Sequence, residues 1–382
     1  MERRSFIQKL TGAAACTLGS PALGKKSNIP QRLILIQLQG GNDGLNTVVP
    51  HKQELYYRLR PNLAIPEKEL ITLNDELGLN PALKALADPW NDGELAIVNG
   101  LGYPQPSFSH FTSTDIWESA SGSADLRDQG WLTRVFHGKN LVSHGLIIGD
   151  YSLGPLAGDS SVLIIPQPRK KFFRQPHRSI TMKTNNEALA HIMSVKDQYQ
   201  QSIGKLFPLA DKSTKGNRPS SRLIRTIDLG LTAIASVPEL PVIKLSLGSF
   251  DTHIRQRKNH DRLLQQLAEG MTYLRSHLKK LGLWESSLVV TYSEFGRRPK
   301  ENQAQGTDHG SASCQFVMGG PVKGGIYGNY PQLDKLHDDN LVFTTDYRRL
   351  YATIIRRLWG EPYQSVLGSY QPLDFLPISR SG

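Results

Sequence analysis

Three short apolar segments constrain the fold of this 382-residue chain, because each has the length and composition of a buried β-strand. They cover residues 33–38, 242–247 and 288–292, and each is followed by a polar motif: GGNDGLN (40–46), SFDTH (249–253) and SEFGR (293–297). A continuous apolar run is typical of a strand in a parallel sheet that is covered on both faces. The carboxyl ends of such strands meet at one edge, and therefore the three motifs are predicted to meet there.

Amphipathic segments alternate with these strands. The clearest predicted helix covers about residues 260–281, where one face carries Leu263, Leu267, Met271, Leu274, Leu278 and Leu281. Shorter helices are predicted at residues 81–87, 111–119 and 347–358, and further strands at 94–99 and 314–318. This alternation predicts an α/β fold, a three-layer sandwich with a mostly parallel central sheet, formed by a single domain over residues 30–380.

The pattern weakens between Leu146 and Ser220, where prolines and basic residues interrupt it. Residues 211–221 form a polar stretch that resembles a mobile loop. We predict a cap or insertion at about residues 150–221, which would cover the pocket. The alternative is a helical excursion that only packs on one side of the sheet.

The N-terminal residues 1–24 have the features of an export signal. The pair Arg3-Arg4 precedes a mildly apolar stretch at residues 10–18 and small residues at 21–24. The apolar stretch is too short to cross a bilayer, which takes about 20 residues. A twin-arginine signal peptide is therefore predicted, with the Tat translocase as a partner during export and a periplasmic or secreted location. The alternatives are a disordered basic N-terminus and lipid attachment at Cys16.

The chain contains two cysteines, and the predicted leader removes one of them. Cys314 would then be the single cysteine of the mature protein, so that no intramolecular disulfide is possible. Its apolar neighbours predict a buried strand residue rather than a nucleophile.

The chain has a formal net charge of +11. Residues 1–24 carry Arg3, Arg4 and Lys9 against Glu2, and therefore +9 remains without them. The basic residues are spread over 169–171, 218–225, 255–258 and 297–298. Such a surface attracts an anionic small-molecule or polymer ester, although solvated basic faces are the alternative. No nucleic acid is expected, because no nucleic-acid-binding motif accompanies the charge, and no transmembrane segment is predicted in the mature chain.

A fourth motif, GTDHG (306–310), completes a set of candidate metal ligands: Asp43, Asp251, His253, Glu294, Asp308 and His309. Carboxylates combined with imidazoles suit a divalent metal such as Zn or Mn. Two ions about 3.5 to 4 Å apart would clamp the attacking and leaving oxygens of a phosphate-like group, although a single ion is also compatible with the set. Alternative roles remain open: Asp43 in turn formation, Glu294 in an ion pair with Arg297, and Asp308 in orienting His309.

The catalytic candidates are Ser109, His110 and Arg297. Ser109 lies where a helix is predicted to begin, and the N-terminus of a helix favours negative charge. It is the candidate nucleophile, and a helix N-cap is its alternative role. His110 is a candidate for metal binding or proton transfer. Arg297 is a candidate for holding an anionic group.

The motifs together resemble a known family. The twin-arginine leader, GGNDGLNTVVP, SHF followed by TDIWESA, SFDTH, YSEFGRRPKEN and GTDHG occur in this order. In this they are similar to the bacterial domain of unknown function 1501 family, over about residues 34–358. That family is grouped with the alkaline phosphatase and sulfatase superfamily, and so the resemblance implies an alkaline phosphatase-like fold.

The resemblance also implies roles for individual residues. Asp43 would be the ligand after the first strand, and Ser109 would lie near the nucleophile position. Asp251 with His253 would form one later ligand pair, and His309, with Asp308, the last. Glu294 stands where many relatives have an Asp-His pair, and here Phe295 follows, so that one expected imidazole is missing.

The function expected from these roles is that of an exported, metal-dependent hydrolase of phosphate or sulfate esters. The alternative is a noncatalytic member of the same fold that binds an envelope polysaccharide or a protein.

Overall fold

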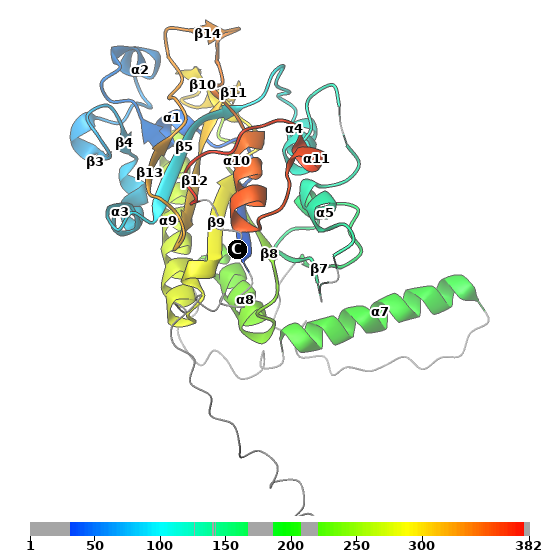
Figure 1. The fold of residues 1–382 in the computed structure, drawn as a ribbon. Coiled ribbons are helices and arrows are strands. Elements are labelled where there is room, and N and C mark those ends of the chain that lie inside the picture. The colour runs from blue at the N-terminus through cyan, green and yellow to red at the C-terminus, as the bar shows by residue number, and fades with distance from the viewer. Residues whose placement is uncertain are drawn as a thin grey trace, which may run out of the picture.

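The computed structural model describes residues 31–125, 127–139, 141, 143–166, 186–207 and 221–377. Its centre is a nine-stranded sheet with the order β13-β5-β12-β9-β1-β8-β6-β7, and β16 also pairs with β5 (Figure 1). The strands are β1 (Arg32–Leu38), β5 (Leu95–Gly102), β6 (Gly145–Ile148), β7 (Val162–Ile165), β8 (Val242–Leu247), β9 (Ser287–Tyr292), β12 (Ser313–Gly319), β13 (Gly325–Tyr327) and β16 (Thr345–Asp346). Only β12 pairs in an antiparallel sense within this sheet, with β5 and β9.

Helices cover both faces of the sheet. One face packs against α8 (Arg222–Ser236) and α9 (Gln256–Lys280), together with the 3-10 helix Pro81–Leu86. The other packs against α4 (His110–Ser119), α5 (Trp131–Phe136) and α10 (Arg348–Thr353), which continues as a π-helical turn over Ile354–Leu358. The predicted α/β fold with a mostly parallel central sheet is confirmed.

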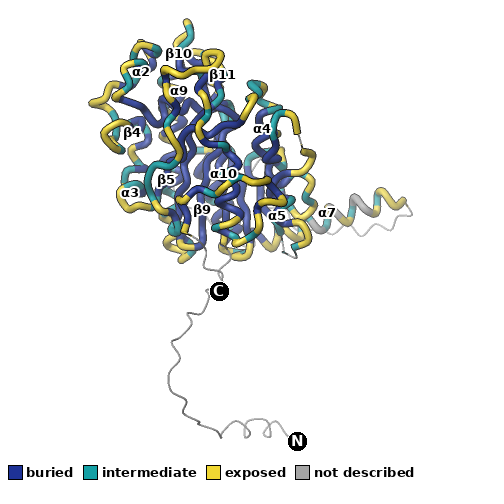
Figure 2. The backbone as a smooth tube through the Cα atoms, turned by 45° about the horizontal axis from the view of Figure 1, so that its top comes forward, coloured by how far each residue is buried: buried dark blue, intermediate teal, exposed yellow. Residues whose placement is uncertain are grey.

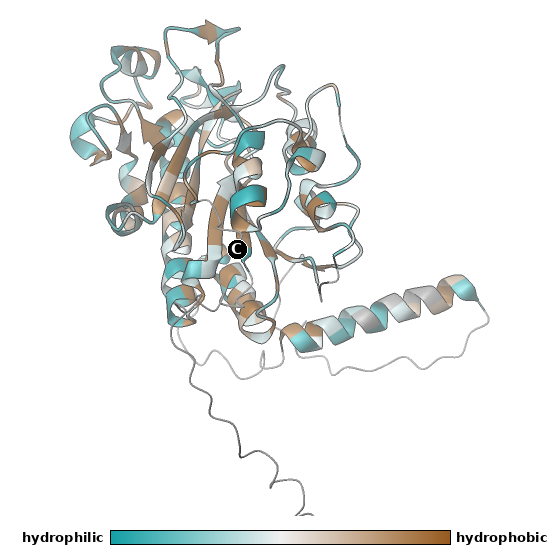
Figure 3. Ribbon diagram, in the orientation of Figure 1, coloured by the Kyte–Doolittle hydropathy of each residue, from teal (hydrophilic) through white to brown (hydrophobic). Residues whose placement is uncertain are grey.

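The side chains of β1 show why the strand sequences are continuously apolar. Ile34 and Ile36 belong to the core beneath α8 and α9, whereas Leu33 and Leu35 belong to the core on the opposite face. Since successive side chains of a strand point to opposite faces, a sheet covered on both sides buries every position. The central strands are accordingly buried and hydrophobic (Figures 2 and 3).

Smaller elements lie outside the central sheet. They are α1 (Gly44–Thr47), α2 (Glu54–Leu59), α3 (Ala87–Asn91) and α11 (Gln364–Leu367), and the strands β2 (Val48–Val49), β3 (Ile71–Thr72), β4 (Gly78–Leu79), β10 (Gly296–Glu301), β11 (Thr307–Gly310), β14 (Leu336–His337) and β15 (Asn340–Leu341). Three-residue 3-10 turns cover Glu67–Glu69, Gly154–Leu156 and Trp284–Ser286. The antiparallel β10-β11 hairpin brings the SEFGR and GTDHG motifs side by side, since Arg297 pairs with His309.

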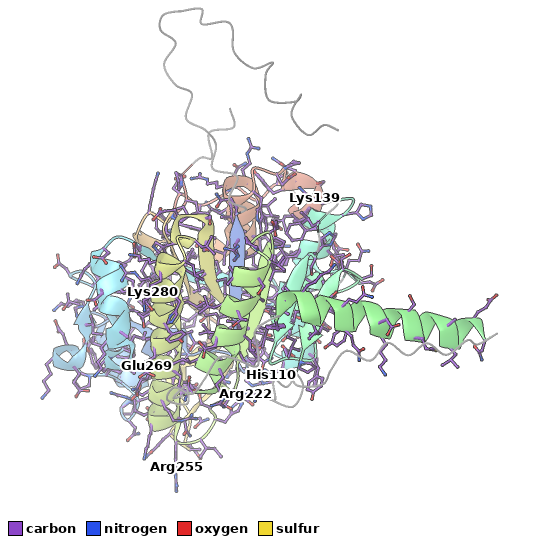
Figure 4. The ribbon with its side chains drawn as sticks, turned by 90° about the horizontal axis from the view of Figure 1, so that it is seen from below. His110, Lys139, Arg222, Arg255, Glu269 and Lys280 are labelled. Atoms are coloured by element: carbon purple, nitrogen blue, oxygen red, sulfur yellow. The ribbon has the colours of Figure 1, made fainter. Side chains whose placement is uncertain are left out.

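The region predicted as an insertion contains β7, which joins the central sheet, and α7 (Glu187–Leu206), which projects from the body of the molecule (Figure 1). The predicted leader with Cys16, the basic residues 169–171 and Arg218 lie outside the described residues. Among the residues that are described, no helix is both long and apolar enough to cross a membrane. The labelled basic residues Lys139, Arg222, Arg255 and Lys280 lie far apart on the molecule (Figure 4).

Candidate metal centre

The turns after β1 and β8 approach each other closely at the carboxyl edge of the sheet. Gly40 has a φ of +116°, and a Cβ added to it would lie 2.3 Å from the backbone nitrogen of Asp251. Glycine is therefore required at position 40, both for the backbone conformation and for the space. The amide of Gly40 also donates a hydrogen bond to Glu294 Oε1 (2.8 Å), which joins the end of β9 to the same edge.

Three imidazoles converge on the carboxylate of Asp251. The Nε2 atoms of His253 and His309 lie 3.0 and 3.2 Å from Asp251 Oδ1, and Nε2 of His110 lies 3.5 Å from Oδ2. One ligand atom each of His110, Asp251 and His309 fall within 4.8 Å of one another. Residues that follow β8, begin α4 and lie on β11 thus meet at one point, which we call the histidine cluster: His110, Asp251, His253 and His309.

The second nitrogen of each imidazole faces an oxygen atom. Nδ1 of His309 lies 2.8 Å from the carbonyl oxygen of Phe108, and Nδ1 of His110 lies 2.8 Å from Glu294 Oε1. Nδ1 of His253 lies 3.5 Å from Asp308 Oδ1. An N–H donated from Nδ1 to oxygen leaves Nε2 with a free lone pair, which is the tautomer that binds metals.

The spacing of the facing atoms suits a divalent cation. Nε2 of His253 and Nε2 of His309 are 3.0 Å apart. Two lone pairs at this separation repel each other unless a proton or a cation lies between them. Zinc bonds to nitrogen of about 2.0 to 2.1 Å in a tetrahedral arrangement place neighbouring ligand atoms about 3.3 Å apart, close to the distances in the histidine cluster.

Arg297 holds Asp251 in place. Its Nη2 donates to Asp251 Oδ1 (2.7 Å) and to the carbonyl oxygen of Phe250 (3.1 Å), while Nη1 donates to the carbonyl oxygen of Thr307 (2.9 Å). Burial opposes ionisation of Asp251, but the hydrogen bond and charge of Arg297 outweigh it and lower the pKa of this carboxyl to about 2. Asp251 is thus an anion across the physiological range.

The structure gives Arg297 a different position from the one predicted for an anion-binding residue. Its side chain is 0% exposed, and Nε donates to the carbonyl oxygen of Gly41 (2.8 Å). All its nitrogens bond within the protein, since the peptide carbonyls of both converging turns accept from it. Arg297 therefore orients the cluster and presents no group to solvent.

Asp43 is not brought into the histidine cluster. Its Oδ1 accepts hydrogen bonds from the amides of Leu45 and Asn46 (3.2 and 3.3 Å), which makes it the N-cap of α1. Its Oδ2 accepts from Arg60 Nη1 (2.7 Å) and from the side-chain nitrogen Nε2 of Gln256. Burial raises the pKa of Asp43, but the charge of Arg60 reverses the effect and leaves it below its ordinary value. Both oxygens are thus engaged with donors of the protein.

The remaining candidates lie around the cluster. Glu294, which is 3% exposed, joins it through His110, and Asp308 joins it through His253. The resemblance implies an imidazole next to Glu294 in the sequence, where this chain has Phe295. In the structure, the imidazole of His110 from α4 lies beside Glu294. The hydrogen bond between His110 and Glu294 raises the pKa of His110, although burial opposes this rise.

Ser109 immediately precedes the cluster residue His110 and is exposed. It occupies the N-cap position of α4, but its side chain makes no capping hydrogen bond. Its hydroxyl forms no hydrogen bond with any residue that the structure describes, and so it is available to react with a bound molecule.

A cavity of about 460 Å³ adjoins the cluster, and part of its lining escaped the sequence predictions. The polar lining residues not predicted are Gln37, Gln39, Thr114, Asp115, Glu118, Asp150 and Ser152. The buried Lys244 lies 2.9 Å from Asp150 Oδ2 and 3.3 Å from Glu118 Oε1. A lysine inside an otherwise apolar strand was the available signal, because a buried cation requires an anionic partner.

A second cavity, of about 350 Å³, borders the other side of Asp251 and His253. It is lined by Ser249, Asp251, Thr252, His253, Ile254, Asn259 and Arg262. Arg262 is exposed and makes no ion pair with the residues that the structure describes. The histidine cluster thus borders one cavity that contains Arg262 and another that contains several carboxylates.

Comparison with known proteins supports the resemblance found in the sequence. The profile of the family described as "Protein of unknown function (DUF1501)" matches residues 231–375, a segment that contains Asp251, His253, Glu294 and His309. The resemblance to this family is therefore confirmed over that segment. No curated protein matches the chain.

Several solved structures are similar to this chain in overall fold. Ps i-CgsB is 12% identical, covers 90% of this chain and 75% of its own, and has a TM-score of 0.45. A sulfatase from Pseudoalteromonas sp. is 12% identical, with 91% and 72% coverage and a TM-score of 0.40. A phosphonate monoester hydrolase from Silicibacter pomeroyi is 10% identical, with 90% and 78% coverage and a TM-score of 0.41. Similarities of this size carry neither an activity nor a substrate over to this chain.

Proposed function

We propose that this protein is a metal-dependent hydrolase of phosphate or sulfate esters. The observation that carries the proposal is the convergence of three imidazole Nε2 atoms on Asp251, with each Nδ1 facing an oxygen. His110, Asp251, His253 and His309 would hold one divalent ion such as Zn or Mn. A bound cation would act as a Lewis acid that stabilises negative charge on an ester oxygen.

Other groups around the cluster have separate roles in the proposed reaction. Glu294, Asp308 and the carbonyl oxygen of Phe108 hold the imidazoles in the ligand tautomer. Arg262 supplies a positive charge for the anionic end of the ester at the second cavity. Ser109 is the proposed nucleophile, because it is exposed beside His110 and its hydroxyl has no hydrogen-bond partner among the described residues.

The proposal includes export. The twin-arginine pair and the short apolar stretch within residues 1–24 support a Tat signal peptide and a periplasmic or secreted location. Purification from the native export route is therefore the appropriate source of protein for the tests below.

The test combines elemental analysis with an ester screen. We expect purified protein to contain close to one equivalent of zinc or manganese and to hydrolyse 4-nitrophenyl phosphate or 4-nitrophenyl sulfate. The variant His309→Ala should lose both metal and activity. His277→Ala is the matched control, because His277 lies near the far end of α9 and contacts the Tyr273 carbonyl instead of the cluster.

Two results would contradict parts of the proposal. Folded protein that takes up no divalent metal, even when dialysed against zinc and manganese, would remove its basis. Metal-loaded protein that is inactive on both ester classes would instead favour the noncatalytic alternative, a protein that binds an envelope polysaccharide or a protein partner.

A further inference from the structure

The cavity beside the histidine cluster extends well beyond the candidate metal centre. It begins at His110, Asp251 and Glu294 and continues along α4 to Glu118. Glu118 follows His110 by eight positions of the helix, which corresponds to about 12 Å along the axis. Its volume of about 460 Å³ lies in the range of small-molecule sites. A substrate held at the cluster therefore has room for a second functional group at the Glu118 end.

Negative charge predominates at that end. Asp115, Glu118 and Asp150 line it, and no lysine or arginine belongs to the lining. Lys244 forms ion pairs with two of them, Glu118 and Asp150. Asp115 makes no ion pair within the described part of the chain. This end of the cavity is thus negative, whereas the protein as a whole has a net positive charge. A cleft lined by one sign of charge concentrates ligands of the opposite sign.

Two buried side chains in the lining have atoms without a partner. Glu118 is 5% exposed; its Oε1 accepts from the hydroxyl of Tyr292 (2.7 Å), while no described residue donates to its Oε2. Gln37 is 3% exposed; its Oε1 accepts from Gln39 (3.3 Å), while its Nε2 donates to none of the described residues. Both residues line the cavity, so that these two atoms can form hydrogen bonds with a ligand or with water there.

An aromatic ring adjoins the carboxylates. Phe111 belongs to the lining, and 85% of its surface is exposed. The face of a phenyl ring attracts cations, and the exposed ring of Phe111 is accessible to one. An amine or a quaternary ammonium would contact this ring and the carboxylates together.

We propose that this cavity binds a positively charged amine or quaternary ammonium group of the substrate. The inference rests on the proposed function, because it places this cation on the alcohol portion of the ester that the cluster would cleave. The substrate is then zwitterionic: its phosphate or sulfate lies at the cluster with Arg262, and its cation lies between Phe111, Asp115 and Glu118.

Binding of choline chloride, measured by isothermal titration calorimetry, tests the cavity without any hydrolysis. We expect saturable binding that weakens with added salt, since the pair of charges is screened. Asp115→Asn should weaken it about fivefold, the effect of one solvent-accessible charge pair. Glu118→Gln should weaken it at least as much. Glu76→Gln is the control, because Glu76 is an exposed carboxylate in the turn between β3 and β4.

A comparison of phosphocholine with glycerol 3-phosphate tests the link to the ester. We expect a higher kcat/KM for phosphocholine, and Asp115→Asn should reduce the difference without changing the metal content. The proposal is overturned if choline binds more weakly than about 10 mM, if Asp115→Asn binds it as the wild type does, or if glycerol 3-phosphate is the better substrate. Choline binding by a protein without hydrolytic activity would refute the proposed function alone, and hydrolysis without choline binding would refute this inference alone.

Discussion

His253 and His309 face each other through their Nε2 atoms at 3.0 Å, although 55 residues separate them in the sequence. His253 follows the central strand β8, whereas His309 lies on β11, where its register is set by pairing with Arg297. Arg297 in turn bonds to Asp251, which contacts both imidazoles. One arginine thus holds Asp251 at the strand edge and pairs with His309 on the hairpin.

Removal of an orienting group should weaken metal binding without abolishing it. Glu294→Gln replaces the carboxylate that faces His110 Nδ1 at 2.8 Å, and loss of such a partner lowers metal affinity about 10- to 100-fold. His253→Ala should lower the affinity further, because it removes one of the proposed ligands. Competition with a chromophoric chelator measures both affinities. Glu269→Gln is the control, because Glu269 is a half-buried carboxylate of α9 that accepts a hydrogen bond from Gln265. Equal affinities for Glu269→Gln and Glu294→Gln would show that Glu294 does not act on the site.

Ser109→Ala tests the proposed nucleophile. If Ser109 attacks the ester, its loss should lower kcat by at least about 10³-fold while the metal content stays unchanged. The measurement is steady-state hydrolysis of whichever 4-nitrophenyl ester the wild type accepts. Ser276→Ala is the control, because its hydroxyl donates to the carbonyl oxygen of Tyr273 on α9. A kcat for Ser109→Ala within a few-fold of the wild type would show that another group, such as water, attacks.

Arg60→Ala should destabilise the protein, whereas metal binding should persist. Arg60 is 0% exposed and pairs with the buried Asp43 at 2.7 Å. Removing one member of a buried ion pair leaves an uncompensated charge and costs about 3 to 5 kcal/mol. Urea unfolding measures this change in the free energy of unfolding.

Substitution of Asp43 decides the role of its carboxylate. The sequence predicts it as a metal ligand, whereas its oxygens bond to Arg60, Gln256 and two amides of α1. Asp43→Asn should retain the metal and lose stability if the carboxylate is structural. Loss of the metal from folded Asp43→Asn would instead show that Asp43 is a ligand.

The sequence predicted the strands and their shared edge well, because burial on both faces of the sheet leaves continuous apolar runs such as that of β1. The antiparallel direction of β12 could not be predicted, since an apolar run carries no information on direction. Periodicity locates elements but does not give the sheet order. His253 was predicted near this edge because its motif follows β8, whereas GTDHG follows no predicted strand, and the β10-β11 hairpin places His309 there.

The convergence of α4 on the same point was less predictable. His110 belongs to a helix that follows β5, and β12 and β9 lie between β5 and β1 in the sheet. No sequence spacing relates His110 to Asp251, and therefore its part in the cluster follows only from the tertiary structure. Likewise, Gln37 and Lys244 are isolated polar residues in apolar strands, and only the structure brings Glu118 and Asp150 to them.

Cys314 should make stability fall with rising pH above its ordinary titration range. Burial raises the pKa of this thiol to about 12, from an ordinary value of 9.0. Between these values the folded protein keeps the proton and the unfolded chain releases it, so that unfolding becomes more favourable as pH rises, and this contribution to stability is complete only below pH 9.0. The slope approaches about 1.4 kcal/mol per pH unit for one group. Urea unfolding of the wild type and of Cys314→Ala at pH 8 to 10.5 isolates the contribution of the thiol. The contributions of the other titrating groups cancel when the free energies of unfolding of the two proteins are subtracted. Parallel pH profiles for the two proteins would show that the thiol ionises equally in the folded and unfolded states.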